Sequence, residues 1–291
     1  MDAIKTNHLT KYYGKVRGIE DVSLTVPEGD FFGFIGPNGA GKSTTIRTLL
    51  GLISPSSGTA TVLGRDVGSR QTDILADVGY LPSEIGFYHG MKAGELIALS
   101  ARLRKKDCAR EAARLCERLA LDPTRKIHEL SFGNRKKVGI VCALQHKPRL
   151  CILDEPTGGL DPLMQKEFYT ILQERNAEGT TIFLSSHVLS EVERYCRHAA
   201  VIRDGKILAV DRVDHLGHTG IKRITLRGYT SLPASDQIRN IKEENGTLSF
   251  LYEGTAPQLL STLSALSPED FTVTDPDLEE VFLHYYTKEA H

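Results

Sequence analysis

The stretch that most constrains this chain is Gly36-Pro-Asn-Gly-Ala-Gly-Lys-Ser43, which reads G-x-x-x-x-G-K-S. It follows an apolar run, residues 31–35, and precedes a helix-like segment, residues 44–52, which is the order that a phosphate-binding loop requires. Because glycine has no Cβ, the three glycines let the backbone turn tightly and point several N–H groups at one anion. The positive N-terminal end of the following helix favours the same anion. A glycine-rich surface turn is the alternative, but the flanking strand and helix favour a nucleoside triphosphate site.

Two side chains of this loop carry the chemistry that a triphosphate needs. Lys42 can reach the β- and γ-phosphates as a mobile positive charge, and the Ser43 hydroxyl can ligate Mg²⁺. The nucleotide-binding residues predicted for this stretch are Gly36, Pro37, Asn38, Gly39, Ala40, Gly41, Lys42, Ser43 and Thr44.

Composition and charge exclude several classes of protein. The 291 residues are 40 % hydrophobic and 25 % charged, with a net charge of −1, which fits neither a disordered chain nor one that coats nucleic acid. No apolar run approaches the roughly 18 residues of a membrane-spanning helix, and the N-terminus lacks the apolar region of a secretory signal. Five cysteines without C-x-x-C spacing indicate reduced thiols and no zinc site. We expect a cytoplasmic protein that binds no nucleic acid.

The order of apolar runs predicts an α/β fold. Residues 4–9 and 22–26 read as strands of an antiparallel edge that leads into the strand before the loop. From residue 31 to about residue 210, strand and helix patterns alternate, which predicts a core sheet with crossover helices.

A helical insertion interrupts this core at residues 89–150. Ala112, Leu115, Cys116 and Leu119 recur at the spacing of one apolar helix face. The segment is basic, with 15 Lys and Arg against 6 Asp and Glu. Three interpretations are open: a solvated helix face, a surface for an acidic protein, and a position near a membrane.

Two adjacent carboxylates follow the apolar run at residues 149–153. Because strands of an α/β sheet present ligand-binding residues at their carboxyl ends, we expect Asp154 and Glu155 near the phosphates. On an extended backbone they would point to opposite sides and could do different work. Asp154 would hold Mg²⁺, and Glu155 would orient or deprotonate the attacking water. His187 follows another strand-like run and is a candidate to polarise the γ-phosphate, with a structural histidine as the alternative.

The texture of the chain changes after residue 211. Residues 216–220 resemble a linker, residues 221–226 and 247–252 alternate like strands, and residues 256–266 and 278–286 have helical patterns. From residue 218 to the end there are 6 basic against 11 acidic residues. We therefore predict a small α/β appendage at residues 218–291.

Taken in order, these motifs resemble those of the ATP-binding subunits of ABC transporters between about residues 4 and 210. The corresponding segments are the A-loop aromatic Tyr13, the Walker A loop 36–43, the LSGGQ-like signature 130–134, the Walker B strand 150–154 with Glu155, the D-loop 159–161 and the switch histidine His187. By the resemblance, Tyr13 stacks on adenine. Without it, Tyr13 could equally be an ordinary strand aromatic.

The resemblance implies a P-loop NTPase domain at residues 1–217 that binds ATP and Mg²⁺. In this family two such domains close head to tail, so Ser131 and Gly133 would contact an ATP bound to a second subunit, and catalysis by Lys42, Glu155 and His187 would need a homo- or heterodimer. An integral membrane subunit, a separate chain, would receive the motion near residues 83–84. The predicted location is the cytoplasmic face of the membrane.

Three positions depart from the family pattern. Phe132 and Asn134 replace a glycine and a glutamine of the signature, which weakens the expected γ-phosphate contact. Ser83 and Glu84 stand where the family has a glutamine or glutamate that contacts Mg²⁺; either of the two could take this role, and Glu84 is the metal candidate. Gly159 replaces a serine or alanine of the D-loop and loosens that turn.

The resulting hypothesis is an ATPase that energises an exporter, because the ending Asp277-Leu-Glu-Glu-Val-Phe-Leu-His284 resembles ABC-2 type exporter subunits for drugs, antibiotics or polysaccharides. One alternative is a soluble ABC-type ATPase that acts on DNA or the ribosome, although the long coiled-coil insertions and zinc modules of that class are not seen in the sequence. Another is a module that holds ATP without hydrolysing it. The sequence does not identify the cargo.

Overall fold

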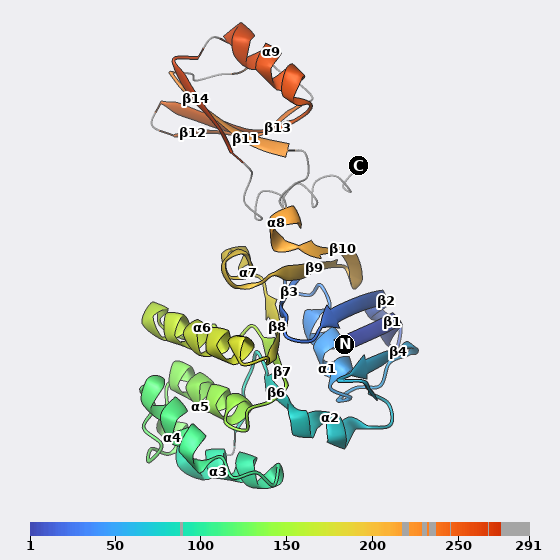
Figure 1. The fold of residues 1–291 in the computed structure, drawn as a ribbon, viewed down its shortest axis with the longest axis vertical. Helices are drawn as coiled ribbons and strands as arrows, with labels where there is room; N and C mark the ends of the chain where they lie inside the picture. The colour runs from blue at the N-terminus through green and yellow to red at the C-terminus, as the bar shows by residue number, and fades with distance from the viewer. Residues whose placement is uncertain are drawn as a thin grey trace. The chain divides into compact units, whose positions relative to one another are not determined.

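The computed structural model describes residues 1–87, 90–216, 221–228, 232, 237–244, 246–266 and 268–274. The chain divides into two compact units, Met1–Asp211 and Arg212–His291, which are described separately (Figure 1). The boundary predicted between residues 217 and 218 lies outside the described residues and stays a prediction.

The first unit is built on a six-stranded sheet in the order β10-β9-β3-β8-β7-β6. Neighbouring strands from β9 to β6 run parallel. Their residues are mostly buried on both faces, which explains why they read as continuous apolar runs. The strands are β3 (Phe31–Ile35), β6 (Val78–Leu81), β7 (Leu150–Asp154), β8 (Thr181–Ser186), β9 (His198–Arg203) and β10 (Lys206–Arg212).

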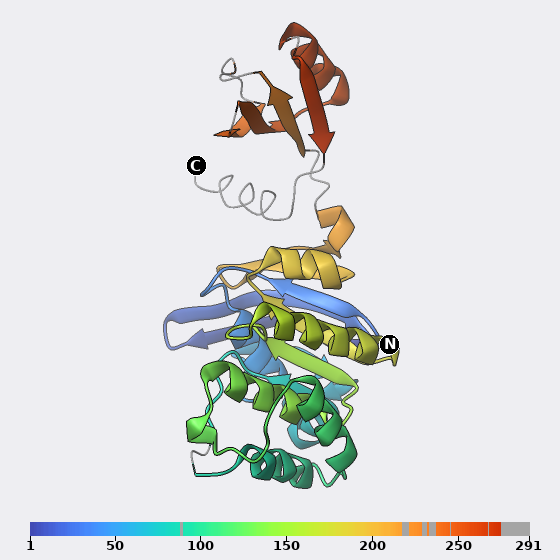
Figure 2. The same ribbon diagram turned by 90° about the vertical axis from the view of Figure 1, so that its left-hand side faces the viewer.

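The predicted antiparallel part forms a separate sheet in the order β2-β1-β4-β5. Its strands are β1 (Asp2–Tyr13), β2 (Val16–Pro27), β4 (Ser57–Val62) and β5 (Arg65–Asp66). Helix α1 (Lys42–Leu49) lies between the two sheets, on the face of the parallel sheet opposite to α5, α6 and α7 (Figures 1 and 2). Ile46 and Leu49 of α1 are fully buried in the core that both sheets share. The predicted α/β class is confirmed.

Helices cover the other face and form the predicted insertion. Ser131 is the N-cap of α5 and accepts a hydrogen bond from the Asn134 N–H at 3.3 Å, so this helix begins at Phe132. Leu115, Cys116 and Leu119 of the predicted apolar stripe are buried. Besides α1, the helices of this unit are α2 (Gln71–Asp77), α3 (Ala93–Leu103), α4 (Ala109–Arg118), a 3-10 turn η1 (Ile127–Glu129), α5 (Phe132–Leu144), α6 (Pro162–Ala177) and α7 (Leu189–Tyr195).

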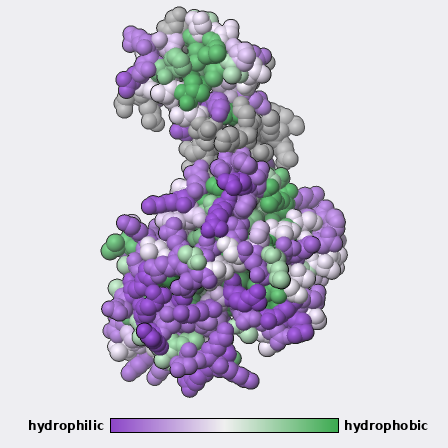
Figure 3. Space-filling view, in the orientation of Figure 1, coloured by the Kyte–Doolittle hydropathy of each residue, from purple (hydrophilic) through white to green (hydrophobic). Residues whose placement is uncertain are grey.

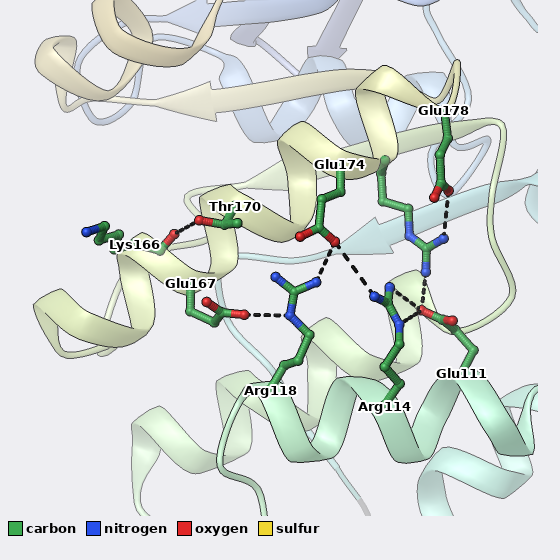
Figure 4. Close-up of polar contacts among 9 residues, drawn as sticks. Glu111, Arg114, Arg118, Lys166, Glu167, Thr170, Glu174 and Glu178 are labelled. Carbon is green, nitrogen blue, oxygen red and sulfur yellow. Dashed lines mark hydrogen bonds and ion pairs between the residues drawn. The ribbon is translucent and has the colours of Figure 1, made fainter.

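Part of the positive charge of the insertion is compensated inside the chain. Arg118 of α4 forms ion pairs with Glu167 and Glu174 of α6, and Arg114 also faces Glu174 (Figure 4). Arg175 of α6 pairs in turn with Glu111 of α4. Around α3 to α5 the face seen in Figure 3 is largely hydrophilic. The basic surplus is therefore in part a set of pairs that attach α4 to α6, which the sequence analysis did not foresee.

The second unit holds a four-stranded antiparallel sheet in the order β12-β13-β11-β14. Leu259 and Leu263 of α9 pack on Phe250 and its neighbours in a small core. The described elements are α8 (Val213–Leu216), β11 (Ile221–Arg227), β12 (Ile238–Glu244), β13 (Thr247–Glu253), α9 (Ala256–Leu266) and β14 (Asp270–Thr274). The helix predicted at residues 278–286 lies outside the described residues. Among the helices described in either unit, none is long and apolar enough to span a bilayer.

His146 is a buried base just beyond α5. Its side chain lies in the core, with Nε2 at 3.3 Å from the Val78 carbonyl oxygen of β6. Burial, together with the positive charges of Arg104 and Lys106, lowers the pKa of His146 to about 4. In the native state His146 therefore stays neutral at pH values where the same histidine in the unfolded chain, with a pKa near 6.5, is already protonated.

We expect the free energy of unfolding to fall as the pH is lowered from 6.5 to 4, because in that window the unfolded chain binds more protons than the native one. His146→Gln keeps a donor toward Val78 but cannot titrate. Urea unfolding at pH 7 and pH 4.5 should show that the wild type loses about 2 kcal/mol more than this variant. His128→Gln, at an exposed histidine, is the control, and equal losses for His146→Gln and wild type would contradict the expectation.

Candidate functional site

The site begins at the loop between β3 and α1, where each of three positions requires glycine for its own structural reason. A Cβ on Gly36 would lie 2.3 Å from the Ile202 carbonyl oxygen. Gly41 has a φ of +106°, and a Cβ there would lie 2.8 Å from the Gly18 carbonyl oxygen. Gly39 has a φ of +82°, a conformation that other residues rarely adopt. The loop can therefore keep this compact path only with glycine at these positions.

Lys42 lies at the first turn of α1, and its side chain is only 5 % exposed. Its ammonium donates to the carbonyl oxygens of Gly36 at 2.6 Å and Pro37 at 3.1 Å. It also lies 3.3 Å from Oε1 of Glu155. The loop thus holds one positive charge inside its own curve, directly across from an acidic side chain.

Asp154 is buried at the end of β7 and joins three elements. Its Oδ2 accepts a hydrogen bond from the Ser43 hydroxyl of α1 at 2.8 Å, and its Oδ1 accepts one from the Ser185 hydroxyl of β8 at 3.0 Å. A carboxylate and a hydroxyl side by side are hard oxygen ligands, and Mg²⁺ is commonly held by one or two such groups together with substrate phosphates. The chemistry of this pair therefore fits Mg²⁺, and the metal role of Ser43 and Asp154 stays a prediction.

Glu155 has a left-handed backbone, so the extended geometry predicted for the acidic pair is wrong. Its φ is +47°, and its N–H donates to the Ser185 carbonyl oxygen at 3.0 Å. After this turn the carboxylate lies between Lys42 and His187, with Oε2 at 3.2 Å from Nδ1 of His187. The two carboxylates still face different partners, but a backbone turn achieves this instead of strand alternation.

A cavity of about 250 Å³ opens beside the loop. It is lined by Tyr13, Arg17, Gly18, Pro37, Asn38, Gly39, Gly41, Lys42, Ser43, Thr44 and Glu155. The Tyr13 side chain is half exposed, and the Lys11 ammonium lies 5.4 Å from its ring centroid. The structure therefore brings Tyr13 to the loop across the β1–β2 hairpin. Sequence analysis missed Arg17 and Gly18, because only the folded hairpin brings them beside the loop.

Seven predicted residues do not line this cavity: Gly36, Ala40, Glu84, Ser131, Gly133, Asp154 and His187. Ser131 is exposed at the N-terminus of α5, Gly133 packs against the Gly159 carbonyl, and Glu84 is exposed. The metal role of Glu84 stays a prediction. The departures at Phe132 and Gly159 are linked in space, because a Cβ on Gly159 would lie 2.2 Å from the Phe132 ring. In this chain the D-loop glycine makes room for the signature phenylalanine.

Lys136 is a buried residue that the sequence analysis did not single out. Its ammonium donates to the carbonyl oxygens of Pro82, Ser83 and Glu155, each at 3.1 Å. Burial lowers the pKa of Lys136 to about 8, an effect that the negative charges of Asp154 and Glu155 oppose. A signal was available in the sequence, because Lys136 lies four positions before the apolar Ile140 and thus on the buried face of α5.

The glycine geometry gives a test that separates lack of space from backbone strain. Gly36→Ala adds a methyl group where a backbone carbonyl already lies, so we expect a loss of about 1–3 kcal/mol in the free energy of unfolding and at least a tenfold loss of ATP affinity. Gly29→Ala, at the opposite end of β3, has a φ of +75° and open space. This control should cost about 1–2 kcal/mol and keep ATP affinity. Denaturant unfolding and fluorescent-nucleotide titration measure both. Equal ATP affinities for the two variants would contradict the role of Gly36.

Comparisons of sequence and of structure relate this chain to known proteins. The family model described as ABC transporter matches residues 19–158. The bacitracin transport ATP-binding protein BcrA of Bacillus licheniformis is 38 % identical over 241 residues, which are 80 % of this chain and 76 % of that protein. The linearmycin resistance ATP-binding protein LnrL of Bacillus subtilis is 32 % identical over 97 % of each chain. A solved ATP-binding subunit of an ABC transporter has a TM-score of 0.70 and 30 % identity, over 74 % of this chain and 91 % of that one.

Proposed function

Because this chain belongs to the ATP-binding proteins of ABC transporters, we propose that it is the ATPase that energises an exporter through a separate membrane subunit. Membership confirms the predicted family and the predicted enzyme class, an ABC-type ATPase. The observation that carries the proposal is the arrangement of Lys42, Glu155 and His187 around one loop. The chain also matches a linearmycin resistance ATP-binding protein over nearly its full length.

The chain's own groups divide the work of hydrolysis. Loop amides and Lys42 bind the β- and γ-phosphates. Tyr13 and Arg17 line the same cavity and would contact the nucleoside. Glu155 accepts the proton of the attacking water, since its carboxylate lies between Lys42 and His187 and is only 27 % exposed. His187 holds that carboxylate in place and faces the γ-phosphate. Ser43 and Asp154 would hold Mg²⁺, which when bound would neutralise charge on the phosphate oxygens.

A second ATP-binding subunit completes the site in this proposal. Ser131 and Gly133 do not line the cavity formed by the loop of their own chain, and Ser131 is exposed at the N-terminal end of α5. The positive end of a helix binds phosphate well. An exposed helix end of this kind supports a contact with the γ-phosphate of an ATP that a second subunit holds.

The membrane subunit is the remaining partner. The relatives are a bacitracin transport protein and a linearmycin resistance protein, which supports an exporter of antibiotic-like or other amphipathic compounds. Segment 83–84 lies between β6 and α3, at the junction of the core sheet and the helical insertion, and is the proposed contact with that subunit. The chain would then work at the cytoplasmic face of the membrane and bind no nucleic acid.

Glu155→Gln should separate binding from hydrolysis. The amide keeps the shape of the side chain but cannot accept the proton, so kcat should fall about 10²- to 10⁴-fold while ATP affinity stays within twofold. Phosphate release and nucleotide titration measure these, and size-exclusion chromatography with Mg²⁺-ATP should show accumulated dimers. Glu117→Gln on the exposed side of α4 is the matched control. Hydrolysis at the wild-type rate in Glu155→Gln would remove the assigned base.

The transporter assignment is tested by purification from detergent-solubilised membranes of the native cell. We expect a multi-span membrane protein to copurify with this chain, with ATPase activity that Lys42→Ala abolishes because the loop loses its mobile charge. Recovery of ribosomal or DNA-bound proteins in place of a membrane protein would overturn the exporter proposal and favour an ATPase with a different mechanical output.

A further inference from the structure

The ammonium of Lys136 uses all its donors on backbone atoms of two distant segments. Two bonds go to the consecutive carbonyls of Pro82 and Ser83 beyond β6, and the third goes to the carbonyl of Glu155 beyond β7. The residue is 2 % exposed. Since an ammonium has three N–H donors, these three bonds satisfy it completely, and one side chain of α5 joins both segments.

The charge of this side chain explains why the two segments can meet. Three carbonyl oxygens, each with partial negative charge, lie 3.1 Å from the same ammonium nitrogen. Without a cation these oxygens would repel one another and lose their hydrogen bonds. Buried polar groups without a hydrogen-bond partner destabilise the folded state and are therefore rare. The positions of segment 82–83 and of the Glu155 peptide therefore depend on the ammonium.

Glu155 links the Lys136 ammonium to catalysis, because it is the proposed general base and its backbone carbonyl accepts one of the three bonds. Its φ of +47° is unfavourable for a residue with a side chain, so surrounding contacts must hold it. Both of its backbone polar groups are held: the N–H by the Ser185 carbonyl of β8 and the carbonyl by Lys136 of α5. Loss of either hydrogen bond would free the backbone turn that places the carboxylate between Lys42 and His187.

We propose that Lys136 is a positioning residue for ATP hydrolysis, which fixes the Glu155 turn and couples it to segment 82–83 and to the helix that begins at the signature. This inference rests on the proposed function and deepens it. A shift of α5 or of segment 82–83 is transmitted to the general base through a single side chain. Lys136 is not among the residues that line the nucleotide cavity, and its hydrogen bonds to Pro82, Ser83 and Glu155 all go to backbone carbonyls, so it acts through the backbone.

The test compares Lys136→Met, which keeps length but has no donors, with Lys136→Gln, whose amide retains two. Purified full-length chains are assayed for kcat and KM with Mg²⁺-ATP and for ATP affinity by nucleotide fluorescence. We expect kcat to fall about 100-fold in Lys136→Met, the effect of a small misplacement of a reacting group, and by less in Lys136→Gln, with ATP affinity within twofold in both. Lys166→Met, on the exposed side of α6, is the control.

Each outcome decides the matter. A kcat of Lys136→Met within twofold of wild type overturns the inference and leaves the proposed function intact. Parallel losses of kcat and ATP affinity also overturn it, because they show a general structural role. If Lys136→Met does not fold, Lys136→Gln decides by the same criteria: lower kcat at unchanged affinity supports the inference, and any other result overturns it. A wild-type chain that hydrolyses no ATP overturns the proposed function, and the inference with it.

Discussion

The buried carboxylate of Asp154 is the interaction on which the site depends. It accepts one hydrogen bond from a hydroxyl of the helix after the loop and another from a hydroxyl of β8, both within 3.0 Å. These bonds fix the depth of the loop helix relative to the carboxyl edge of the parallel sheet. Because β3, β7 and β8 are neighbours in parallel register, the loop, the acidic pair and the segment before His187 all arrive at the same edge.

Two sets of charged contacts attach the helical insertion to this core, and they differ in kind. The arginines of α4 meet the glutamates of α6 at partly exposed positions (Figure 4), where ion pairs contribute little individually. The buried ammonium of Lys136 instead donates to backbone carbonyls, one of which belongs to the general base Glu155. The first set holds the insertion against α6, whereas the second reaches the backbone that carries Glu155.

Much of the site was predictable because its chemistry is encoded in short stretches. The loop glycines, Lys42 and Ser43 lie within eight residues, and the apolar run that ends in Asp154 announces a buried strand. The residues that were missed come from elsewhere in the chain. Arg17 and Gly18 reach the cavity across the β1–β2 hairpin, and Ser185 reaches Asp154 through strand pairing. Their local sequence carries no sign of those partners.

The sequence by itself determined the alternation of strand and helix, the phosphate loop and the identity of the acidic pair, because periodicity and glycine placement act over a few residues. Only the tertiary structure decided that Glu155 turns left-handed, that Gly159 makes room for Phe132, and that Lys136 is buried among carbonyls of two other segments. These features depend on groups far apart in the chain, whose desolvation and mutual contact arise only when the sheet assembles.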